Sequence, residues 1–426
     1  MMGKTDIKND QEYVFLSLMI PDRLSREVSE NSKRTMVDAA NALEHNLVRG
    51  FADNLPNPPK VVNLLPIGSY PQYYKKPFIS SSSFSLCGRD DQLNFGFCNI
   101  KLIRNYHIEI SLYRYLDQYC KKKNGEINLC IYSASAVFLS VAKKLKRKYP
   151  NIVICNIIAD LPGMTNLSNK KSKVLQWFIE HRAKKAMHGL SSIDCFVVLT
   201  KQMAEYLHIN KPFCVIEGIA SETKESNRRE SCEKKVILYA GTLHEKFGVM
   251  NLVKAFQLID APDYRLVICG IGDSADAIRK AAEKDSRISF LGQLPRAEVL
   301  EWQKRVTVLV NPRQNNEDFV KYSFPSKILE YLSSGTPVVA YKLDGIPAEY
   351  DRYIQYVEDD SIETLMNKLI GVCELAEKER KEMGRRGRLF VLSEKNSDVQ
   401  TKKIIELIEF TRKTTRSGGG VLNVHI

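Results

Sequence analysis

The chain has 426 residues, of which 44% are hydrophobic, and its formal net charge is +13. This length is sufficient for two domains of ordinary size, each with its own core. Ten cysteines at irregular spacings, several of them inside apolar runs, indicate buried thiols and exclude a disulfide framework. The sequence has no run of about 18 apolar residues and its first twelve residues are polar, so we expect a cytosolic protein without a membrane span.

The first half of the chain alternates apolar runs with helical patterns. Strands are predicted at Tyr13–Met19, Lys60–Pro66, Ile127–Tyr132, Ile152–Ile158 and Cys195–Leu199, and helices at Thr35–Phe51 and Ala136–Lys148. This alternation is typical of a Rossmann-like domain with a parallel sheet, which we place at residues 1–220.

One acidic residue follows a strand of this first domain. Asp160 comes directly after the strand Ile152–Ile158, so it should lie at the carboxyl edge of the sheet, where ligands bind. An aspartate at this edge can hold an acceptor hydroxyl in the manner of a positioned base. The alternative is a turn residue, because Leu-Pro-Gly follows it.

A basic and apolar segment lies between residues 170 and 185. Its residues are Lys170, Lys171, Lys173, Trp177, Phe178, Lys184 and Lys185. Lysines around a Trp-bearing apolar stripe are typical of an interfacial helix, and each cation near an anionic leaflet contributes about 1 kcal/mol. The segment predicts peripheral contact with the inner face of the plasma membrane. The alternative is an amphipathic helix packed on its own domain. Nucleic-acid binding is not favoured, because no recognised binding motif accompanies the lysines.

The second half has a clearer α/β pattern after a polar segment at 217–235, which reads as an interdomain linker. Strands are predicted at Lys234–Ala240, Tyr264–Cys269, Ile288–Gly292, Val306–Asn311 and Val338–Tyr341. We place a second Rossmann-like domain at 234–395, a helix that crosses back to the first domain at 396–413, and a tail at 414–426.

The stretch from residue 321 to 337 is the most informative about function. Pro325 can open a helix of about ten residues, and Gly335 with Pro337 ends it. Ser323, Ser326 and Lys327 then surround a helix N-terminus, which favours an anion such as phosphate.

Glu330 lies one turn beyond Lys327, where its carboxylate can accept hydrogen bonds from a sugar diol. Phosphate and diol together indicate a nucleotide. The alternative is an amphipathic helix with no ligand.

Five motifs of this region resemble one known family when they are taken in order. They are Tyr-Ala-Gly-Thr-Leu from 239, Cys-Gly-Ile-Gly from 269, Phe-Leu-Gly from 290, Asn-Pro-Arg from 311, and Lys-Tyr-Ser-Phe-Pro-Ser-Lys-Ile-Leu-Glu-Tyr from 321. Together they resemble the donor-binding domain of glycosyltransferase family 4, in a branch of bacterial surface-polysaccharide enzymes. The resemblance implies the α/β GT-B fold, with two Rossmann-like domains, an interdomain cleft and a returning C-terminal helix.

The resemblance also implies roles for individual residues. It assigns Glu330 to the ribose hydroxyls and Gly241 and Thr242 to a loop that faces the phosphates. The segment that wraps the diphosphate and nucleoside would be Tyr322, Ser323, Phe324, Pro325 and Ser326.

This sequence departs from the family pattern at two places. Tyr322 stands where the first glutamate of an acidic pair is usual, and Glu317 or Asp318 is the candidate replacement. Thr242 and Phe247 stand where a basic pair is usual, and Lys246 and Lys327 are the candidate substitutes. Cations here would stabilise a diphosphate leaving group.

The resemblance implies a retaining hexosyltransferase that needs neither a metal nor a cofactor. Its substrates would be a nucleotide diphosphate sugar and a lipid-linked or polysaccharide acceptor. Two alternatives share the fold: a non-catalytic partner subunit of a heteromeric transferase, and a nucleotide-sugar 2-epimerase. An NAD(P) dehydrogenase is not favoured, because the turn at Gly270 and Gly272 lacks the third glycine of a dinucleotide fingerprint.

Overall fold

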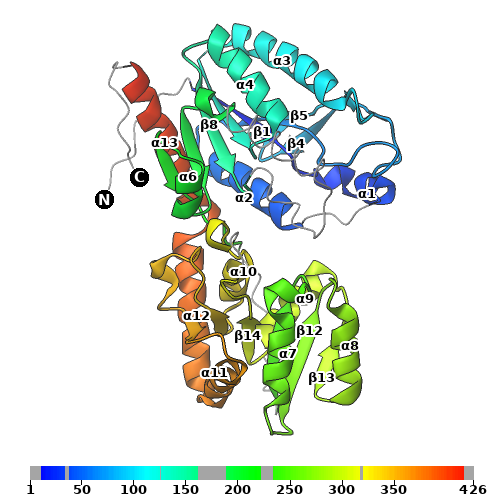
Figure 1. Ribbon diagram of the computed structural model, residues 1–426. Coiled ribbons are helices and arrows are strands. Elements are labelled where there is room, and N and C mark those ends of the chain that lie inside the picture. Colours follow the sequence, from blue (N-terminus) through cyan, green and yellow to red (C-terminus); the bar gives the residue numbers. More distant parts are fainter. Residues whose placement is uncertain are drawn as a thin grey trace. The chain divides into compact units, whose positions relative to one another are not determined.

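The computed structural model describes residues 11–33, 38–124, 126–161, 189–221, 234–316 and 320–416. The chain divides into two compact units (Figure 1). Residues 1–216 and 397–426 form the first unit, and residues 217–396 form the second. Both are α/β units around a largely parallel sheet, as the alternating sequence pattern predicts.

An eight-stranded sheet forms the centre of the first unit, in the order β10-β9-β8-β7-β1-β2-β5-β4. Its strands are β1 (Glu12–Ser17), β2 (Lys60–Asn63), β4 (Ser82–Leu86), β5 (Arg89–Asn94), β7 (Ile127–Tyr132), β8 (Val153–Ile158), β9 (Cys195–Val198) and β10 (Phe213–Val215). All neighbours pair in parallel except β4 and β5. A separate antiparallel pair joins β3 (Phe78–Ile79) to β6 (Phe97–Cys98). The central strands lie where apolar runs predict them, because both of their faces are covered.

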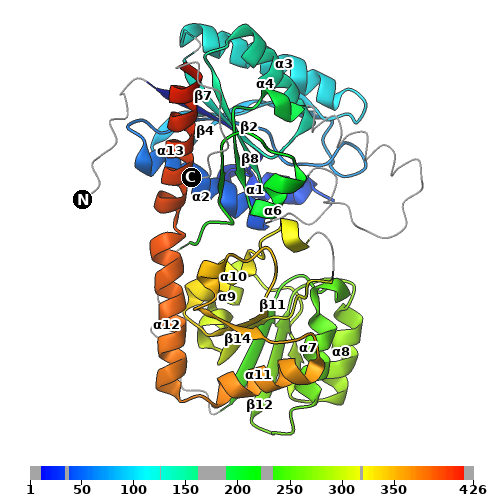
Figure 2. The same ribbon diagram turned by 60° about the vertical axis from the view of Figure 1, so that its left-hand side comes forward.

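Helices cover both faces of this sheet. They are α1 (Asp22–Asn31), α2 (Asp38–Asn54), α3 (Arg104–Lys122), α4 (Ala136–Lys148), α6 (Lys201–Tyr206) and α13 (Ser397–Arg416), with a 3₁₀ turn at Leu190–Ser192. Helix α3 packs beside α4, and α2 packs beside α13 (Figures 1 and 2). The connections through α2 and α3 run in opposite directions across the sheet, so right-handed crossovers put these two helices on opposite faces. Arg412 of α13 donates to Asn128 of β7 at 2.6 Å, which fixes α13 to the first unit.

The second unit has a six-stranded, fully parallel sheet in the order β13-β12-β11-β14-β15-β16. Its strands are β11 (Lys235–Ala240), β12 (Tyr264–Cys269), β13 (Ile288–Phe290), β14 (Val308–Asn311), β15 (Val338–Tyr341) and β16 (Ile354–Val357). The strand order reverses between β11 and β14. In sheets of this kind, ligands bind outside the carboxyl ends of the strands at such a switch point.

Within the described residues of the second unit, six helices flank the sheet. They are α7 (Val249–Gln257), α8 (Ala275–Lys284), α9 (Arg296–Arg305), α10 (Lys327–Ser334), α11 (Ile362–Glu374) and α12 (Glu377–Glu394), with 3₁₀ turns at Glu245–Phe247, Val320–Tyr322 and Ala348–Tyr350. Helix α7 contacts α8 and α11, whereas α10 contacts α9 and α12 (Figure 2).

Helix α10 is shorter than the sequence predicts. It begins at Lys327 and has eight residues, because Pro325 belongs to a preceding turn whose carbonyl accepts a hydrogen bond from the Ile328 amide at 2.8 Å. Its end is as predicted, since Gly335 terminates it with a positive φ of 76°.

A buried ion pair lies where the chain enters and leaves the second unit. The Lys395 ammonium lies 2.5 Å from the Glu217 carboxylate, and these side chains are only 3% and 2% exposed. Tyr350 also donates to Glu217 at 2.7 Å, and the Ala220 amide donates to the Lys395 carbonyl at 2.7 Å. Residues 217–220 are therefore packed in the second unit, although the sequence reads them as the start of a linker.

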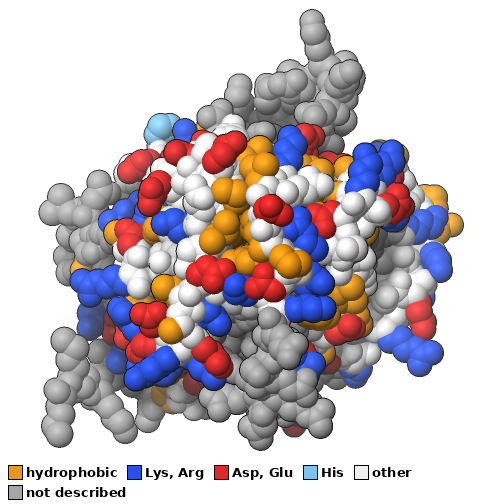
Figure 3. Space-filling view, turned by 90° about the horizontal axis from the view of Figure 1, so that it is seen from below, with side chains coloured by type: hydrophobic (Ala, Val, Ile, Leu, Met, Phe, Trp, Pro, Cys, Tyr) orange, Lys and Arg blue, Asp and Glu red, His pale blue; other side chains and the backbone are white. Residues whose placement is uncertain are grey.

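The described cysteines are free, and those in the predicted strands are buried: Cys130, Cys155, Cys195 and Cys269. None of the described helices combines the length and hydrophobicity that a membrane span requires. On the face shown in Figure 3, Lys and Arg side chains are interspersed with Asp and Glu. The charge of +13 is therefore not gathered into a single basic patch on that face.

One buried carboxyl group of the first unit makes its stability depend on pH. Glu44 is 1% exposed and accepts hydrogen bonds from Ser17 Oγ at 2.8 Å and the Leu18 amide at 2.7 Å. Burial raises its pKa from 4.5 to about 8. Because the folded state holds this proton more tightly, the stabilisation is complete below 4.5 and is lost as the pH rises through about 8.

We therefore expect Glu44→Gln to become progressively more stable than the wild type as the pH rises through about 8. The amide oxygen of Gln can take the place of Oε2 and accept from both Ser17 Oγ and the Leu18 amide, but the side chain cannot ionise. Melting temperatures measured between pH 4.5 and a pH above about 8 test the prediction. Glu205→Gln is the control at an exposed glutamate. A constant difference between wild type and Glu44→Gln at all pH values would contradict it.

Candidate functional site

Two glycine turns meet at the carboxyl edge of the second sheet. The Gly241 amide donates to the Cys269 carbonyl at 2.9 Å, and the Leu243 amide donates to the Ile271 carbonyl at 2.8 Å. Gly270 has a φ of 142°, and a Cβ atom there would overlap the Gly241 carbonyl oxygen. Only glycine fits at position 270, so the loops after β11 and β12 form one backbone surface.

A cation lies against this backbone surface. A Cβ atom at Gly241 would lie 2.6 Å from Lys327 Nζ, so the lysine crosses from the start of α10 to the loop after β11. Among the residues that the structure describes, no carboxylate or other acceptor lies within bonding distance of this ammonium. Burial lowers the pKa of Lys327, although the charge of Glu330 acts in the opposite direction. A half-buried cation of this kind can be neutralised by an anionic ligand.

A second cation, Arg313, was not assigned a role from the sequence. It lies two residues after the end of β14 and donates from Nη2 to Ser323 Oγ at 3.1 Å. Burial lowers its pKa to about 10, so it remains charged at neutral pH. Its guanidinium lies 5.3 Å from the Phe247 ring centroid, and Lys246 Nζ lies 5.6 Å from the same centroid. The position of Arg313 at a strand's carboxyl end was the signal that could have identified it.

Glu330 is held in place by two residues of α9. Arg296 Nη1 lies 2.9 Å from Oε2, and Gln303 Nε2 donates to Oε1 at 2.7 Å. The Glu330 side chain is 22% exposed, so it retains access to solvent or a ligand. Sequence reasoning found Glu330 and missed both partners, which lie on another helix. Each carboxylate oxygen has a further lone pair that can accept a ligand hydroxyl.

A histidine–carboxylate contact joins the two glycine turns on their outer side. His244 Nδ1 lies 2.9 Å from Asp273 Oδ2, and the Glu245 amide donates to Asp273 Oδ1 at 3.2 Å. These contacts hold the start of the 3₁₀ turn that carries Lys246. Sequence reasoning did not single out either His244 or Asp273.

The other predicted donor residues occupy different environments. Thr242 is exposed, and its carbonyl accepts a hydrogen bond from Tyr239 Oη at 2.8 Å. Tyr322 is half-buried, Ser326 is exposed and Pro325 is buried. Phe324 is 6% exposed, and its ring lies 5.3 Å from that of Tyr350 in the core.

The buried position of Phe324 limits its side chain to a packing role, so only its backbone remains available to a ligand. Asp160 of the first unit is exposed and follows β8 by two residues. Seven further candidates lie outside the described residues: Lys170, Lys171, Lys173, Trp177, Phe178, Lys184 and Lys185.

Glu317 and Asp318, the candidate replacements for the missing glutamate, also lie outside the described residues. Within the described part of the chain, no group of three or more His, Cys, Asp or Glu side chains has the arrangement of a metal site. The described cations and backbone amides nevertheless form a surface suited to an anion.

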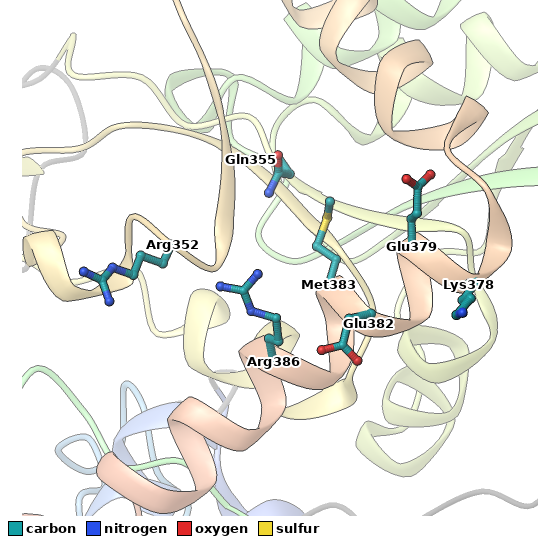
Figure 4. Close-up of a pocket in the computed structure, with 7 residues that line it drawn as sticks. All are labelled: Arg352, Gln355, Lys378, Glu379, Glu382, Met383 and Arg386. Atoms are coloured by element: carbon teal, nitrogen blue, oxygen red, sulfur yellow. The ribbon is translucent and has the colours of Figure 1, made fainter.

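A cavity of about 500 Å³ lies elsewhere in the second unit (Figure 4). It is lined by Arg352, Gln355, Lys378, Glu379, Glu382, Met383 and Arg386. Arg352 precedes β16 and the other residues come from β16 and the first half of α12, so the cavity is not at the carboxyl edge of the sheet. Its charges are mixed, and Glu382 is already paired with Arg385 at 2.7 Å.

Comparison with known proteins relates the second unit to one family. Residues 234–374 match the family model of glycosyl transferases group 1. The chain is 33% identical over 137 residues to D-inositol 3-phosphate glycosyltransferase of Corynebacterium glutamicum, covering 29% of this chain and 31% of that protein. It is 29% identical over 199 residues to an exopolysaccharide phosphotransferase of Streptomyces coelicolor, covering 43% and 20%. The chain thus spans a third or less of these curated relatives.

The likeness to solved structures extends over nearly the whole chain. Sucrose-phosphate synthase from Thermosynechococcus elongatus aligns with a TM-score of 0.64 and 15% identity, covering 94% of this chain and 98% of that one. Anabaena HepE, solved in complex with UDP, aligns with a TM-score of 0.61 and 12% identity, covering 94% and 100%. The chain therefore has the two-unit GT-B fold of these proteins, as the sequence motifs predict.

Proposed function

We propose that the protein is a retaining glycosyltransferase of family 4 that takes a nucleotide diphosphate sugar as its donor. The observation that carries the proposal is the Lys327 ammonium, which has no bonded partner among the described residues and lies against the glycine turn at Gly241. The match of residues 234–374 to glycosyl transferases group 1 supports it. The UDP bound to the structural neighbour HepE also supports it.

In this proposal the diphosphate lies between the glycine turns and the start of α10. Lys327 and Arg313 face its charge, and Lys246 on the outer 3₁₀ turn adds a third cation. Arg313 takes the place of the basic residue that the family carries where this chain has Thr242. The ribose diol of the nucleotide binds to Glu330, whose orientation Arg296 and Gln303 fix.

The proposed reaction uses the leaving diphosphate as the proton acceptor. The bond from the anomeric carbon to the diphosphate breaks, while the acceptor hydroxyl attacks from the same face and passes its proton to the diphosphate. The cations stabilise the negative charge that develops on the leaving group. Asp160 orients the acceptor hydroxyl, so no side chain has to be a strong base, and the reaction needs no metal or cofactor.

The proposed acceptor is a lipid-linked sugar or a polysaccharide, in the synthesis of a surface glycan such as a capsule or exopolysaccharide. The name of the Streptomyces relative supports a polysaccharide context. The cationic segment 170–185 supports a location at the inner face of the plasma membrane. Peripheral membrane contact would bring the enzyme to a lipid-linked acceptor.

The first experiment is a thermal-shift panel of UDP, GDP, CDP and their sugars without metal, with NAD(P) as the competing class. A cognate nucleotide at a hundredfold excess over Kd should stabilise the protein by about 2.7 kcal/mol. Stabilisation by one nucleoside diphosphate identifies the donor base. A shift by NAD(P) alone would instead overturn the proposal in favour of a dehydrogenase.

Glu330→Ala should lower kcat/KM for the donor by about 1–3 kcal/mol, mainly through a higher KM, because the buried sugar hydroxyls lose their acceptor. Initial rates at varied donor concentration measure this change. Glu283→Ala on α8 is the control at an exposed carboxylate. Donor kinetics unchanged by Glu330→Ala would remove Glu330 from the site.

One departure from the family pattern favours a second candidate function. Tyr322 stands where the family has a glutamate that contacts the donor sugar. A non-catalytic partner subunit of a heteromeric transferase would bind a nucleotide sugar without turning it over. A 2-epimerase of the same fold would release a free nucleoside diphosphate without an acceptor, so product analysis separates the three activities.

A further inference from the structure

Six large apolar side chains of the first unit are exposed in the segments that precede and begin α3. They are Tyr70 (37% exposed), Phe78 (66%), Ile100 (38%), Leu102 (91%), Ile103 (48%) and Tyr106 (70%). We refer to these six residues as the apolar surface. Exposure of this much large apolar area in one region is typical of an interaction site.

Backbone hydrogen bonds join the segments that carry the apolar surface. The Tyr70 amide donates to the Asn99 carbonyl at 3.0 Å, and the Asn99 amide donates to the Pro77 carbonyl at 2.7 Å. Strand β3 pairs with β6, which places Phe78 opposite the residues just before Ile100. The Arg104 amide donates to the Ile100 carbonyl at 2.9 Å and so starts α3 from the same place. The exposed side chains are therefore neighbours and not scattered residues.

Two of these residues lie close together where the chain enters α3: Leu102 in the turn before the helix and Tyr106 in its first turn. Leu102 and Tyr106 are four residues apart, which puts them on one side of a helical turn. Arg104 lies between them, and its guanidinium faces inward, where it donates to the Ile67 carbonyl at 2.8 Å and lies 5.0 Å from the Phe97 ring centroid. The contacts of Arg104 thus anchor this segment to the first unit while Leu102 and Tyr106 stay exposed.

The charged side chains within the segments that carry the apolar surface have one sign. The segments 66–80 and 96–108 contain no aspartate or glutamate, whereas Lys75, Lys76 and Lys101 are all exposed. Lys76 lies 2.6 Å from Glu27 of α1, and Lys101 has no bonded partner among the described residues. Lysines beside exposed aromatic and aliphatic side chains complement an anionic lipid interface.

The apolar surface also lies at the functional edge of its sheet. Strands β2 and β5 are parallel neighbours, and the chain leaves the carboxyl ends of both to form the segments with Tyr70 and Phe97. Asp160 follows β8 at the same carboxyl edge. An acceptor held in a membrane would reach this edge of the first unit if the membrane bound next to it.

We propose that the apolar surface docks the first unit onto an anionic lipid bilayer. Phe78 and Leu102 enter the boundary between headgroups and acyl chains, and Lys75, Lys76 and Lys101 face the lipid phosphates. This inference deepens the proposed function by assigning membrane contact to described residues that are separate from the segment 170–185. The proposed function explains why the protein would dock on a membrane. The docking itself is measured without donor or turnover.

The test is co-sedimentation of the full chain with phosphatidylcholine vesicles, with and without phosphatidylglycerol. The wild type should bind the anionic vesicles, and higher salt should weaken the binding. Phe78→Asp with Leu102→Asp should lower the vesicle partition coefficient at least tenfold, because two apolar anchors are lost. Both side chains are mostly exposed, so the melting temperature of the variant should match that of the wild type.

Leu258→Asp with Leu389→Asp is the matched control, since these residues are 50% and 53% exposed on the second unit. An equal loss of binding in this control would show that exposed apolar side chains anywhere on the protein adsorb to the vesicles, and it would overturn the proposal. Undiminished binding of the Phe78/Leu102 variant would also overturn the proposal. The clearest such result would be a second variant, with Gln at the five lysines of segment 170–185, that no longer binds. A wild-type dimer that the Phe78/Leu102 variant converts to a monomer would identify a second copy as the occupant.

A failure of docking leaves the donor proposal intact, because nucleotide binding is measured in the thermal-shift panel without vesicles. A failure of nucleotide binding likewise leaves the vesicle result unchanged. The two proposals are therefore distinguishable.

Discussion

Replacing Lys327 with methionine should raise the melting temperature of the ligand-free protein by a few degrees and lower donor kcat/KM at least a hundredfold. The half-buried ammonium has no bonded partner among the described residues, so an apolar side chain of similar length removes a desolvation cost of about 1–3 kcal/mol. The same change removes a cation that stabilises the leaving diphosphate, a loss of about 3–4 kcal/mol in the transition state. Stability and activity should thus change in opposite directions.

The effect of Lys327→Met on stability should also depend on pH. Because burial lowers the pKa of Lys327, the unfolded chain binds this proton more tightly than the folded protein does. Rising pH therefore stabilises the wild type between the lowered pKa and 10.5, and the advantage of Lys327→Met should shrink across that interval.

Scanning calorimetry and initial rates test both parts, with Lys280→Met as the control at an exposed lysine of α8. A variant that is less stable than the wild type, with unchanged donor kinetics, would make Lys327 a structural residue. It would also remove the observation on which the proposed function depends.

The largest expected loss of stability comes from Lys395→Met. This substitution removes the only cation that lies within ion-pair distance of the Glu217 carboxylate among the described residues. Glu217 is 2% exposed, and a buried carboxylate without its partner typically costs 3–5 kcal/mol, so we expect a loss of about that size. The free energy of unfolding from urea titration measures it.

A second substitution separates the charge from the packing at this position. Glu217→Gln with Lys395→Met removes both charges, and the amide oxygen can still accept the hydrogen bond from Tyr350. This double variant should recover most of the loss. Lys381→Met is the control, because its pair with Glu377 is about half exposed and should contribute less than about 1 kcal/mol. Equal stability of Lys395→Met and Lys381→Met would contradict the prediction.

The sequence predicts the buried parallel strands well and the edges poorly. The bounds of β7, β12 and β15 agree with the predicted ranges, because each strand is a largely apolar run between polar turns. Strands β4 and β5 were missed, since Ser82–Leu86 and Arg89–Asn94 are largely polar. They form an antiparallel edge with exposed positions, and hydrophobic periodicity is weak in such strands.

The candidate site is predictable only where its residues are close in sequence. Gly241, Lys327 and Glu330 follow from glycine turns and a helix start, which are local patterns. Arg296 and Gln303 reach Glu330 from α9 across about 30 residues of chain, and no local pattern indicates such a contact. The packing role of Phe324 was missed for the same reason, because its partner Tyr350 lies on a later turn.

The contact between Glu217 and Lys395 joins the two ends of the second unit, which matters for domain exchange. The second unit interrupts the first between residues 216 and 397, so it is an insertion with two covalent ends. These ends are held together by the ion pair and by the hydrogen bond from Ala220 to Lys395. An inserted domain whose ends already lie together needs no new spacer, so residues 217–396 form a cassette that can be exchanged as one piece.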